Sequence, residues 1–127
     1  MHLVNAGGFC QFVMMAANTA KIPEWINETT GWDVTREELL QAGERIGNMR
    51  MVFEVREGGN PTKRAVPRRM VDGSVLPGGP NQQITLDTAT LEKDFLAAAD
   101  WDPDTAKPSA NKLRELGLAD LIPAMHG

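Results

Sequence analysis

The sequence predicts an all-α, multihelical fold that contains one long irregular loop, at about residues 58–87. Three observations support this. No segment alternates apolar and polar residues as a half-buried strand does. Several segments carry helix start and stop signals, and proline- and glycine-rich turns recur between Gly58 and Asp87. The 127 residues, of which 42% are hydrophobic, fit a single helical domain over residues 1–127 with a core of moderate size.

Two helices are expected before the first strong capping signal. The run from Gly8 to about Ala20 is apolar on most sides, which predicts a helix that is buried nearly all round. Pro23 suits the first position of a short second helix, because its missing N–H is not needed there. Gly31 suits the end of that helix.

The clearest helix start lies at Thr35, where Thr35 and Glu38 can form a capping box. A helix of about 20 residues should follow and end at Gly58-Gly59. A mostly apolar stripe runs along it: Leu39, Gly43, Ile46, Arg50 and Phe53. Gly43 and Gly47 would weaken an isolated helix. Another helix or a ligand is therefore expected to approach closely there, and simple close packing is the favoured interpretation.

The irregular loop over residues 58–87 separates this helix from the rest of the chain. Loops of that length are generally mobile or laid over a neighbouring surface. After it, Asp87 or Thr88 is expected to cap a helix. Ser109 should cap a last helix, with Gly117 in the left-handed position after its end and Leu118 folding back.

Charge and cysteine content exclude several classes of protein. The net charge of −4 argues against a dedicated nucleic-acid binder. A single cysteine cannot form an internal disulfide, which predicts a reducing, cytoplasmic setting. No apolar run approaches the roughly 20 residues that span a bilayer, and no secretory leader is recognisable. Neither a membrane nor a nucleic acid is therefore expected as a partner.

Cationic side chains gather between Arg45 and Arg69. Over residues 44–69, seven Lys or Arg residues stand against three glutamates. Arginines can grip phosphates or carboxylates in a bidentate way. A solvated face that pairs with the acidic remainder explains them equally well. The first interpretation leads to an alternative function, a non-enzymatic helical binding module that docks a partner through Arg45–Arg69.

Cys10 is the only candidate nucleophile or soft metal ligand. It follows Gly7-Gly8 near a predicted helix start, where amide N–H groups favour the thiolate that ligates iron. Yet a lone cysteine between Phe9 and Phe12 is more often a small buried hydrophobe. An iron–sulfur cluster needs about four thiolates, so the others would come from elsewhere. A standalone thiol redox protein is the weakest hypothesis, because no resolving cysteine is present.

A series of short motifs runs in order along the chain. It begins with Asn5-Ala6-Gly7-Gly8-Phe9-Cys10. It continues through Thr30–Thr35, Glu37–Leu40, Gly43–Asn48, Arg56–Gly58, Pro67–Arg69, Trp101–Pro103 and Leu113–Leu118. From Asn5 to Leu121 their order and spacing resemble the aldehyde ferredoxin oxidoreductase family, where the first motif reads Asp-x-x-Gly-Leu-Cys. Asp100 and Thr105-Ala106 stand where that family has glycines.

The resemblance implies a role for the first motif. Cys10 would provide one ligand of a 4Fe–4S cluster beside a tungsten- or molybdenum-bis-pterin cofactor, and the other three cysteines lie upstream in the family. Gly8 would bring backbone to the pterin, and Phe9 replaces a leucine. Asn5 occupies the position of an acidic residue that hydrogen-bonds the pterin; its amide can still donate and accept, but it carries no charge. The family's acid/base residues lie upstream, so no catalytic residue is assigned here.

The resemblance also implies a function, that of a C-terminal cofactor-binding domain. The complete enzyme would oxidise aldehydes to carboxylates and pass electrons through the cluster to ferredoxin, with the redox chemistry supplied by the cofactors. Relatives in the family reduce other substrates, including aromatic thioesters, so the substrate stays open. The expected partners are the N-terminal domains of the same enzyme and ferredoxin or another redox protein. The isolated chain should hold no cofactor and be inactive. It should also expose an apolar patch around Phe9, Phe12 and Met15, through which it could self-associate.

Overall fold

The computed structural model describes residues 2–67, 78–80 and 86–126. Apart from an isolated β-bridge between Trp101 and Pro108, regular structure in these residues is helical, so the predicted all-α class is confirmed. Residues 68–77 and 81–85 of the predicted loop lie outside the described residues. Among the described helices, none combines the length and the apolar character that crossing a membrane would require.

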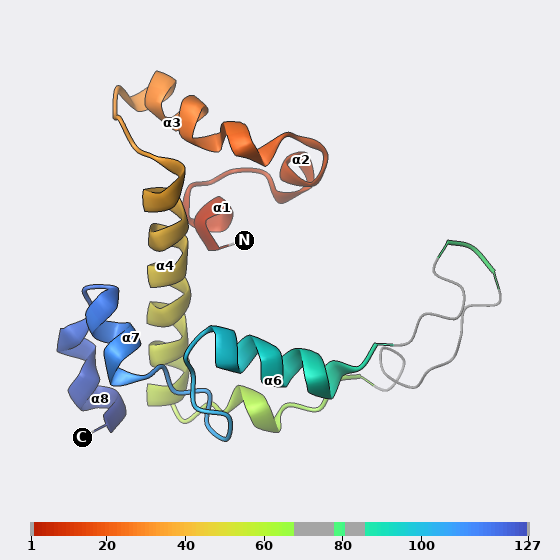
Figure 1. The fold of residues 1–127 in the computed structure, drawn as a ribbon, viewed down its shortest axis with the longest axis vertical. Helices are drawn as coiled ribbons and strands as arrows, with labels where there is room; N and C mark the ends of the chain where they lie inside the picture. The colour runs from red at the N-terminus through yellow and green to blue at the C-terminus, as the bar shows by residue number, and fades with distance from the viewer. Residues whose placement is uncertain (1, 68–77, 81–85, 127) are drawn as a thin grey trace.

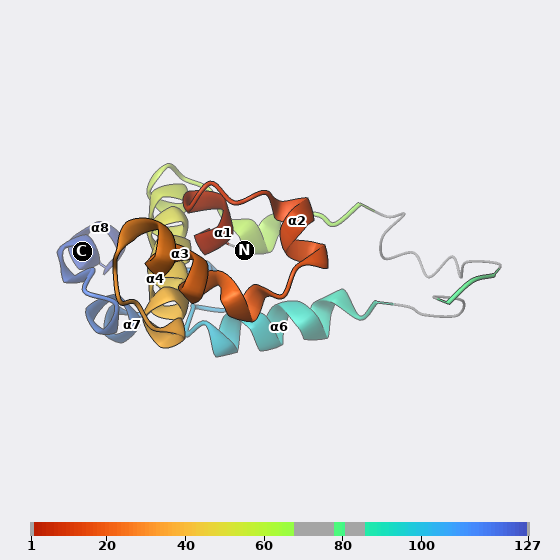
Figure 2. The same cartoon turned by 90° about the horizontal axis from the view of Figure 1, so that it is seen from above.

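One long helix organises the fold. α4 (Arg36–Arg56) runs along the molecule, with α1, α2 and α3 at its N-terminal end and α6, α7 and α8 at the other (Figure 1). Seen along α4, α7 and α8 lie on one side and α6 extends away from another (Figure 2). The other helices are α1 (His2–Ala6), α2 (Gln11–Ala16), η1 (Thr19–Lys21), α3 (Ile22–Thr30), η2 (Pro61–Lys63), α6 (Thr88–Ala98), α7 (Ala110–Glu115), η3 (Ala119–Leu121) and α8 (Ile122–His126).

The N-terminal segment differs from its prediction. Instead of one buried helix from Gly8 to Ala20, this stretch forms the short helix α2 and the start of η1, and a turn in which Gly8 has φ +73° separates α2 from α1. No residue of α2 is buried. An apolar run predicts burial only if other parts of the fold cover it. Most of α2 is left exposed by the described residues, with Met14 half-buried.

The capping signals around α3 and α4 are confirmed. α3 begins at Ile22, one residue before Pro23, and Gly31 follows its last residue with φ +74°. At the start of α4, the Thr35 hydroxyl accepts from the Glu38 amide at 3.2 Å. The Thr35 amide donates to Glu38 Oε2 at 2.8 Å. This is the capping box expected from the sequence.

The main core lies where α7 and α8 pack against the C-terminal half of α4. It contains these buried side chains: Val52, Leu113, Leu116, Leu118 and Met125. Ser109 caps α7 by accepting from the Lys112 amide at 3.0 Å. Gly117 has φ +67°, and the Leu118 amide donates back to the Leu113 carbonyl at 2.7 Å, as predicted for this helix end. α8 follows where the sequence signals predicted no further helix.

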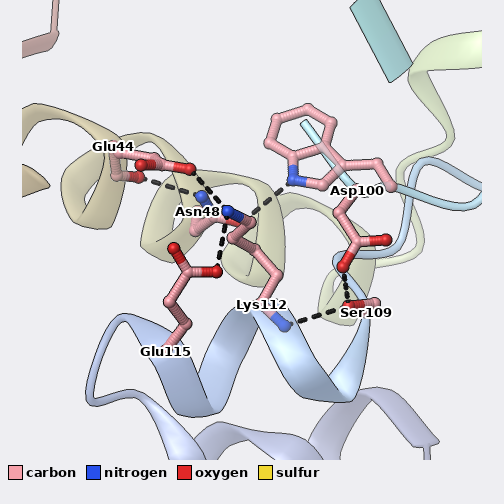
Figure 3. A network of polar contacts seen from close by, with 7 residues as sticks. Glu44, Asn48, Asp100, Ser109, Lys112 and Glu115 are labelled. Carbon is pink, nitrogen blue, oxygen red and sulfur yellow. Dashed lines mark hydrogen bonds and ion pairs between the residues drawn. The ribbon is translucent and has the colours of Figure 1, made fainter. Parts of the chain in front are cut away.

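A polar network joins α4 to α7 and to the segment after α6 (Figure 3). The Trp101 indole N–H donates to Asn48 Oδ1 at 2.9 Å, and Asn48 Nδ2 donates to the Glu44 carbonyl at 3.0 Å. Asn48 is only 3% exposed, so its amide needs these partners. Lys112 Nζ lies 3.0 Å from both Glu115 Oε2 and Glu44 Oε1, and its hydrogen bonds to these glutamates raise the pKa of Lys112.

The connection from α6 to α7 is a tightly bonded turn, as Trp101-Asp102-Pro103-Asp104 suggests. Asp102 Oδ1 accepts from the amides of Asp104 and Thr105 at 3.1 and 2.8 Å. Hydrogen bonds from Thr105 lower the pKa of Asp102. Asp100 and Ala106 both have φ 56°, the left-handed region that favours glycine. They are two of the positions at which the resemblance expects glycine, so the chain has kept a left-handed backbone without it.

Candidate cofactor site

The candidate residues Asn5, Gly8, Phe9 and Cys10 lie on the turn between α1 and α2. Backbone hydrogen bonds tie this turn to α1: the Gly7 amide donates to the Leu3 carbonyl at 2.8 Å and the Phe9 amide to the Val4 carbonyl at 3.0 Å. Gly8 combines a positive φ with open space, because a Cβ placed on it would meet no heavy atom within 4 Å. A large group could therefore approach the backbone at Gly8.

The Cys10 side chain is exposed. Cys10 is the N-cap residue of α2, and its carbonyl accepts from the Met14 amide at 3.1 Å, while its side chain caps no amide. The interpretation of Cys10 as a small buried hydrophobe is therefore wrong for this chain. The thiol is free to meet a ligand from outside.

Asn5 and Phe9 differ in their surroundings. Asn5 is exposed on α1. Phe9 is half-buried, with its ring against Gly7, where an added Cβ would lie 2.9 Å from Phe9 Cε2. Of the candidate residues, Asn5, Gly8 and Cys10 are open to solvent and Phe9 supports the turn from one side.

A single cysteine cannot hold a cluster. Within residues 2–67, 78–80 and 86–126, no three or more His, Cys, Asp or Glu side chains gather in a way that could hold a metal ion. A cluster bound at Cys10 needs about three more thiolates from outside this part of the chain. Cys10 is the single cysteine of the chain, so it can supply one thiolate ligand of such a cluster and no more.

An apolar surface lies beside Cys10. Phe12 is 82% exposed and Met15 is 78% exposed, which confirms two members of the expected patch. The third expected member, Phe9, is half-buried, so the prediction of an exposed side chain was wrong there. Exposed aromatic and thioether side chains on one short helix are typical of a surface that another part of a protein covers.

A pocket that the sequence did not predict lies between α1, α3 and α4. It has a volume of about 570 Å³, and Phe9 lines it together with Trp25, Ile26, Trp32 and Leu39. Trp25 and Trp32 on either side of Gly31 were a signal that could have indicated it. Its position shows that Phe9 faces an apolar groove on the side of the turn that leads to α3 and α4.

The basic stretch is largely engaged in local contacts. Arg56 Nη2 lies 3.0 Å from Glu57 Oε1, Arg64 pairs with Glu54, and Arg50 Nη1 donates to His2 Nδ1 at 3.2 Å. Partial burial, and then the Arg50 charge, lower the pKa of His2. Arg68 and Arg69 lie outside the described residues. Arg56 and Arg64 thus pair with glutamates of the basic stretch itself, and the expected pairing with the acidic remainder of the chain is not among these contacts.

Comparison with known proteins gives consistent matches. Residues 1–118 match the family described as aldehyde ferredoxin oxidoreductase, domains 2 and 3. Proteins named tungsten-containing aldehyde ferredoxin oxidoreductase are similar to the chain: 30% identical over 121 residues in Pyrococcus abyssi, 29% over 119 in Pyrococcus furiosus and 28% over 121 in Thermococcus kodakarensis. These alignments cover 94%, 93% and 94% of this chain but 20%, 19% and 20% of the relatives. The chain thus spans about a fifth of the length of these relatives.

Proposed function

The chain belongs to the aldehyde ferredoxin oxidoreductase family, and from this premise we propose that it is a C-terminal cofactor-binding domain of a tungsten- or molybdenum-pterin, iron–sulfur oxidoreductase. One observation supports the proposal: the Cys10 thiol is exposed on a glycine turn, and the motif resemblance assigns this cysteine as the cluster ligand. Alone, the chain would be inactive, because it supplies one thiolate and no catalytic residue.

The chain's own residues would bind and orient the cofactors. Cys10 would ligate one iron of a 4Fe–4S cluster as a thiolate, the form that binds metal. The open backbone at Gly8 would admit the pterin, and the Asn5 amide could donate to it or accept from it without adding charge. The apolar side chains of Phe12 and Met15 would exclude water from one side of the cluster.

The complete enzyme would oxidise an aldehyde and water to a carboxylic acid, releasing two protons and two electrons. The pterin-bound metal and the cluster would supply this redox chemistry when bound. The electrons would pass to ferredoxin or another redox protein. The remaining domains of the same enzyme would provide the other three cysteines and the acid/base residues.

The test is a Cys10→Ser substitution in the complete enzyme. A serine hydroxyl is a poor substitute for a thiolate, so the variant should lose most of its cluster iron and the low-temperature electron paramagnetic resonance signal of the reduced cluster. Met49→Ala is the matched control, because it removes another exposed sulfur side chain, one that has no proposed contact with the cofactors. Its iron content and spectrum should equal those of the parent.

If Cys10→Ser retains the iron content and spectrum of Met49→Ala, Cys10 is not a cluster ligand and the proposal is wrong. The isolated 127-residue chain provides the complementary measurement. It should not oxidise an aldehyde with an artificial electron acceptor.

A further inference from the structure

α1 packs against α4 at two glycines. A Cβ on Gly43 would lie 3.4 Å from Leu3 Cβ and 3.8 Å from the Leu3 amide nitrogen. A Cβ on Gly47 would lie 3.0 Å from His2 Cδ2, which is tighter than ordinary van der Waals contact. Gly43 and Gly47 are four residues apart, so they lie on one face of α4, one turn from each other. Together these two glycines form a surface without side chains on which α1 packs, and this contact is the α1 seat.

α1 depends on packing against α4. It has five residues, none of them buried, and an isolated helix of that length is not stable in water. One polar contact with α4 is the hydrogen bond between Arg50 Nη1 and His2 Nδ1. The two glycine contacts and this hydrogen bond thus contribute to the orientation of α1.

The turn that carries Cys10 is hydrogen-bonded to α1 and should move together with it. The amides of Gly7 and Phe9 donate to the carbonyls of Leu3 and Val4, and Leu3 is the residue seated on Gly43. A displacement of α1 would thus carry the turn, and Cys10 with it. The glycines also lower the helix propensity of α4 by about 1 kcal/mol each relative to alanine, so they weaken the helix in which they lie.

We propose that Gly43 and Gly47 are positioning residues for the cofactor-binding turn: their missing side chains set how closely α1 lies on α4, and thereby where Cys10 is held. The link to cofactor binding rests on the proposed function; the seat itself does not. Larger residues at these positions should favour α4 as an isolated helix while they push Cys10 away.

The first experiment measures the position of Cys10 in the 127-residue chain. Cys10 is the only native cysteine, so a second label site at Asn111→Cys, exposed on α7, gives a specific spin-labelled pair. Gly47→Leu should displace and broaden the distance distribution between the two labels. His2→Ala alone is the reference for the loss of the hydrogen bond to Arg50. Gly47→Leu combined with His2→Ala should give the same distribution as this reference, because the ring that the new leucine would meet is absent in both.

Gln41→Leu is the matched control, since Gln41 is exposed on the same helix and does not contact α1. The proposal is overturned if Gly47→Leu and Gln41→Leu give the same distance distribution. If Gly47→Leu fails to fold, as judged by circular dichroism, Gly47→Ala makes the same test with a smaller displacement.

The second experiment uses the complete enzyme and separates the two proposals. Gly47→Leu should lower the cluster signal in the parent but not in the His2→Ala background, a difference that a general loss of stability would not produce. If Cys10→Ser removes the cluster and Gly47→Leu moves Cys10 but leaves the cluster signal intact, the positioning role is wrong. If Cys10→Ser also leaves the cluster intact, the proposed function fails, whereas the label distances still decide whether the seat exists.

Discussion

The left-handed backbone conformation is adopted in this chain both by glycines and by residues with a Cβ, for which it is unfavourable. Gly117 takes φ +67° after α7, whereas Asp100 and Ala106 take φ 56°. For a residue with a Cβ this conformation costs about 1–2 kcal/mol. Contacts offset the cost: the Asp100 carboxylate accepts a hydrogen bond from the Ser109 hydroxyl, and Ala106 is 1% exposed.

Gly117→Ala should lower the free energy of unfolding by about 1–2 kcal/mol. The reason is purely the backbone, because the nearest atom to the new Cβ would be Arg45 Nη1 at 3.8 Å, an ordinary contact. Urea denaturation measures the change. Gly78→Ala is the control, since its backbone is not in the left-handed region and no atom lies within 4 Å of the new Cβ. An equal loss in both variants would contradict the backbone explanation.

Single residues were predictable where local chemistry decides their role. Thr35, Ser109 and Gly117 were placed correctly because caps and left-handed helix ends depend on a few adjacent atoms. The exposure of Cys10 was not predictable from its neighbours. Burial depends on which distant residues cover a side chain, and the residues flanking Cys10 only suggested that it would be covered.

At the scale of elements, the capping box of α4 offers a direct test. Thr35→Ala removes the hydroxyl that accepts from the Glu38 amide and donates to Glu38 Oε2, so it should cost about 1 kcal/mol of stability. Thr29→Ala is the control. The Thr29 hydroxyl donates to the Trp25 carbonyl inside α3, whose amide bonding does not depend on it, so its loss should change little.

The effect of Thr35→Ala should also depend on pH. Hydrogen bonds from the Thr35 amide and then its hydroxyl lower the pKa of Glu38 below its usual 4.5. A lowered carboxylate pKa contributes stability that is present above the unfolded pKa and is lost as pH falls through the folded pKa. The difference between Thr35→Ala and the parent should therefore be largest above pH 4.5 and shrink in more acidic solution. A difference that is constant down to pH 2 would mean that the bond from the Thr35 hydroxyl to Glu38 Oε2 does not contribute to stability, since alanine keeps the backbone bond to Glu38.

Helices with strong end signals were predicted better than short ones. α3, α4, α6 and α7 carry caps or terminal glycines and were found close to their expected bounds. α1 and α8 have five residues each and were missed. Helices this short are stabilised by packing and not by their own sequence, so a local pattern contains little information about them.

At the scale of the whole molecule, apolar side chains are unevenly covered. The core around Val52 and Leu113 occupies the end where α7 and α8 meet α4. Large apolar side chains elsewhere are open, including Phe12 and Met15 on α2 and Phe95 on α6. A domain with so much uncovered apolar surface is suited to lie against other parts of a larger protein.

The isolated chain should therefore self-associate through α2. Replacing Phe12 and Met15 by serine removes two apolar side chains that are 82% and 78% exposed, so the double variant should shift towards monomer. Sedimentation velocity over a range of concentrations measures this shift. Leu40→Ser is the control, because Leu40 is also exposed, at 60%, but lies on α4. An association that Leu40→Ser weakens as much as the double variant would place the contact elsewhere.

The sequence predicted the class of the fold but not its arrangement. Nothing local indicates that α1 would be seated on Gly43 and Gly47, although the glycines themselves predicted a close approach. Such long-range packing depends on the shapes of both partners. The middle of the predicted loop lies outside the described residues, so its expected role of covering a neighbouring surface stays a prediction.

The start of that loop is bonded to a distant part of the chain. Asn60 Nδ2 and the Thr62 hydroxyl both donate to the Asp104 carbonyl, at 3.0 and 2.8 Å. These bonds join the segment after α4 directly to the turn after α6, although the bonded residues are 44 and 42 positions apart in the sequence. The association of these two segments therefore does not depend on the chain between Pro67 and Leu86.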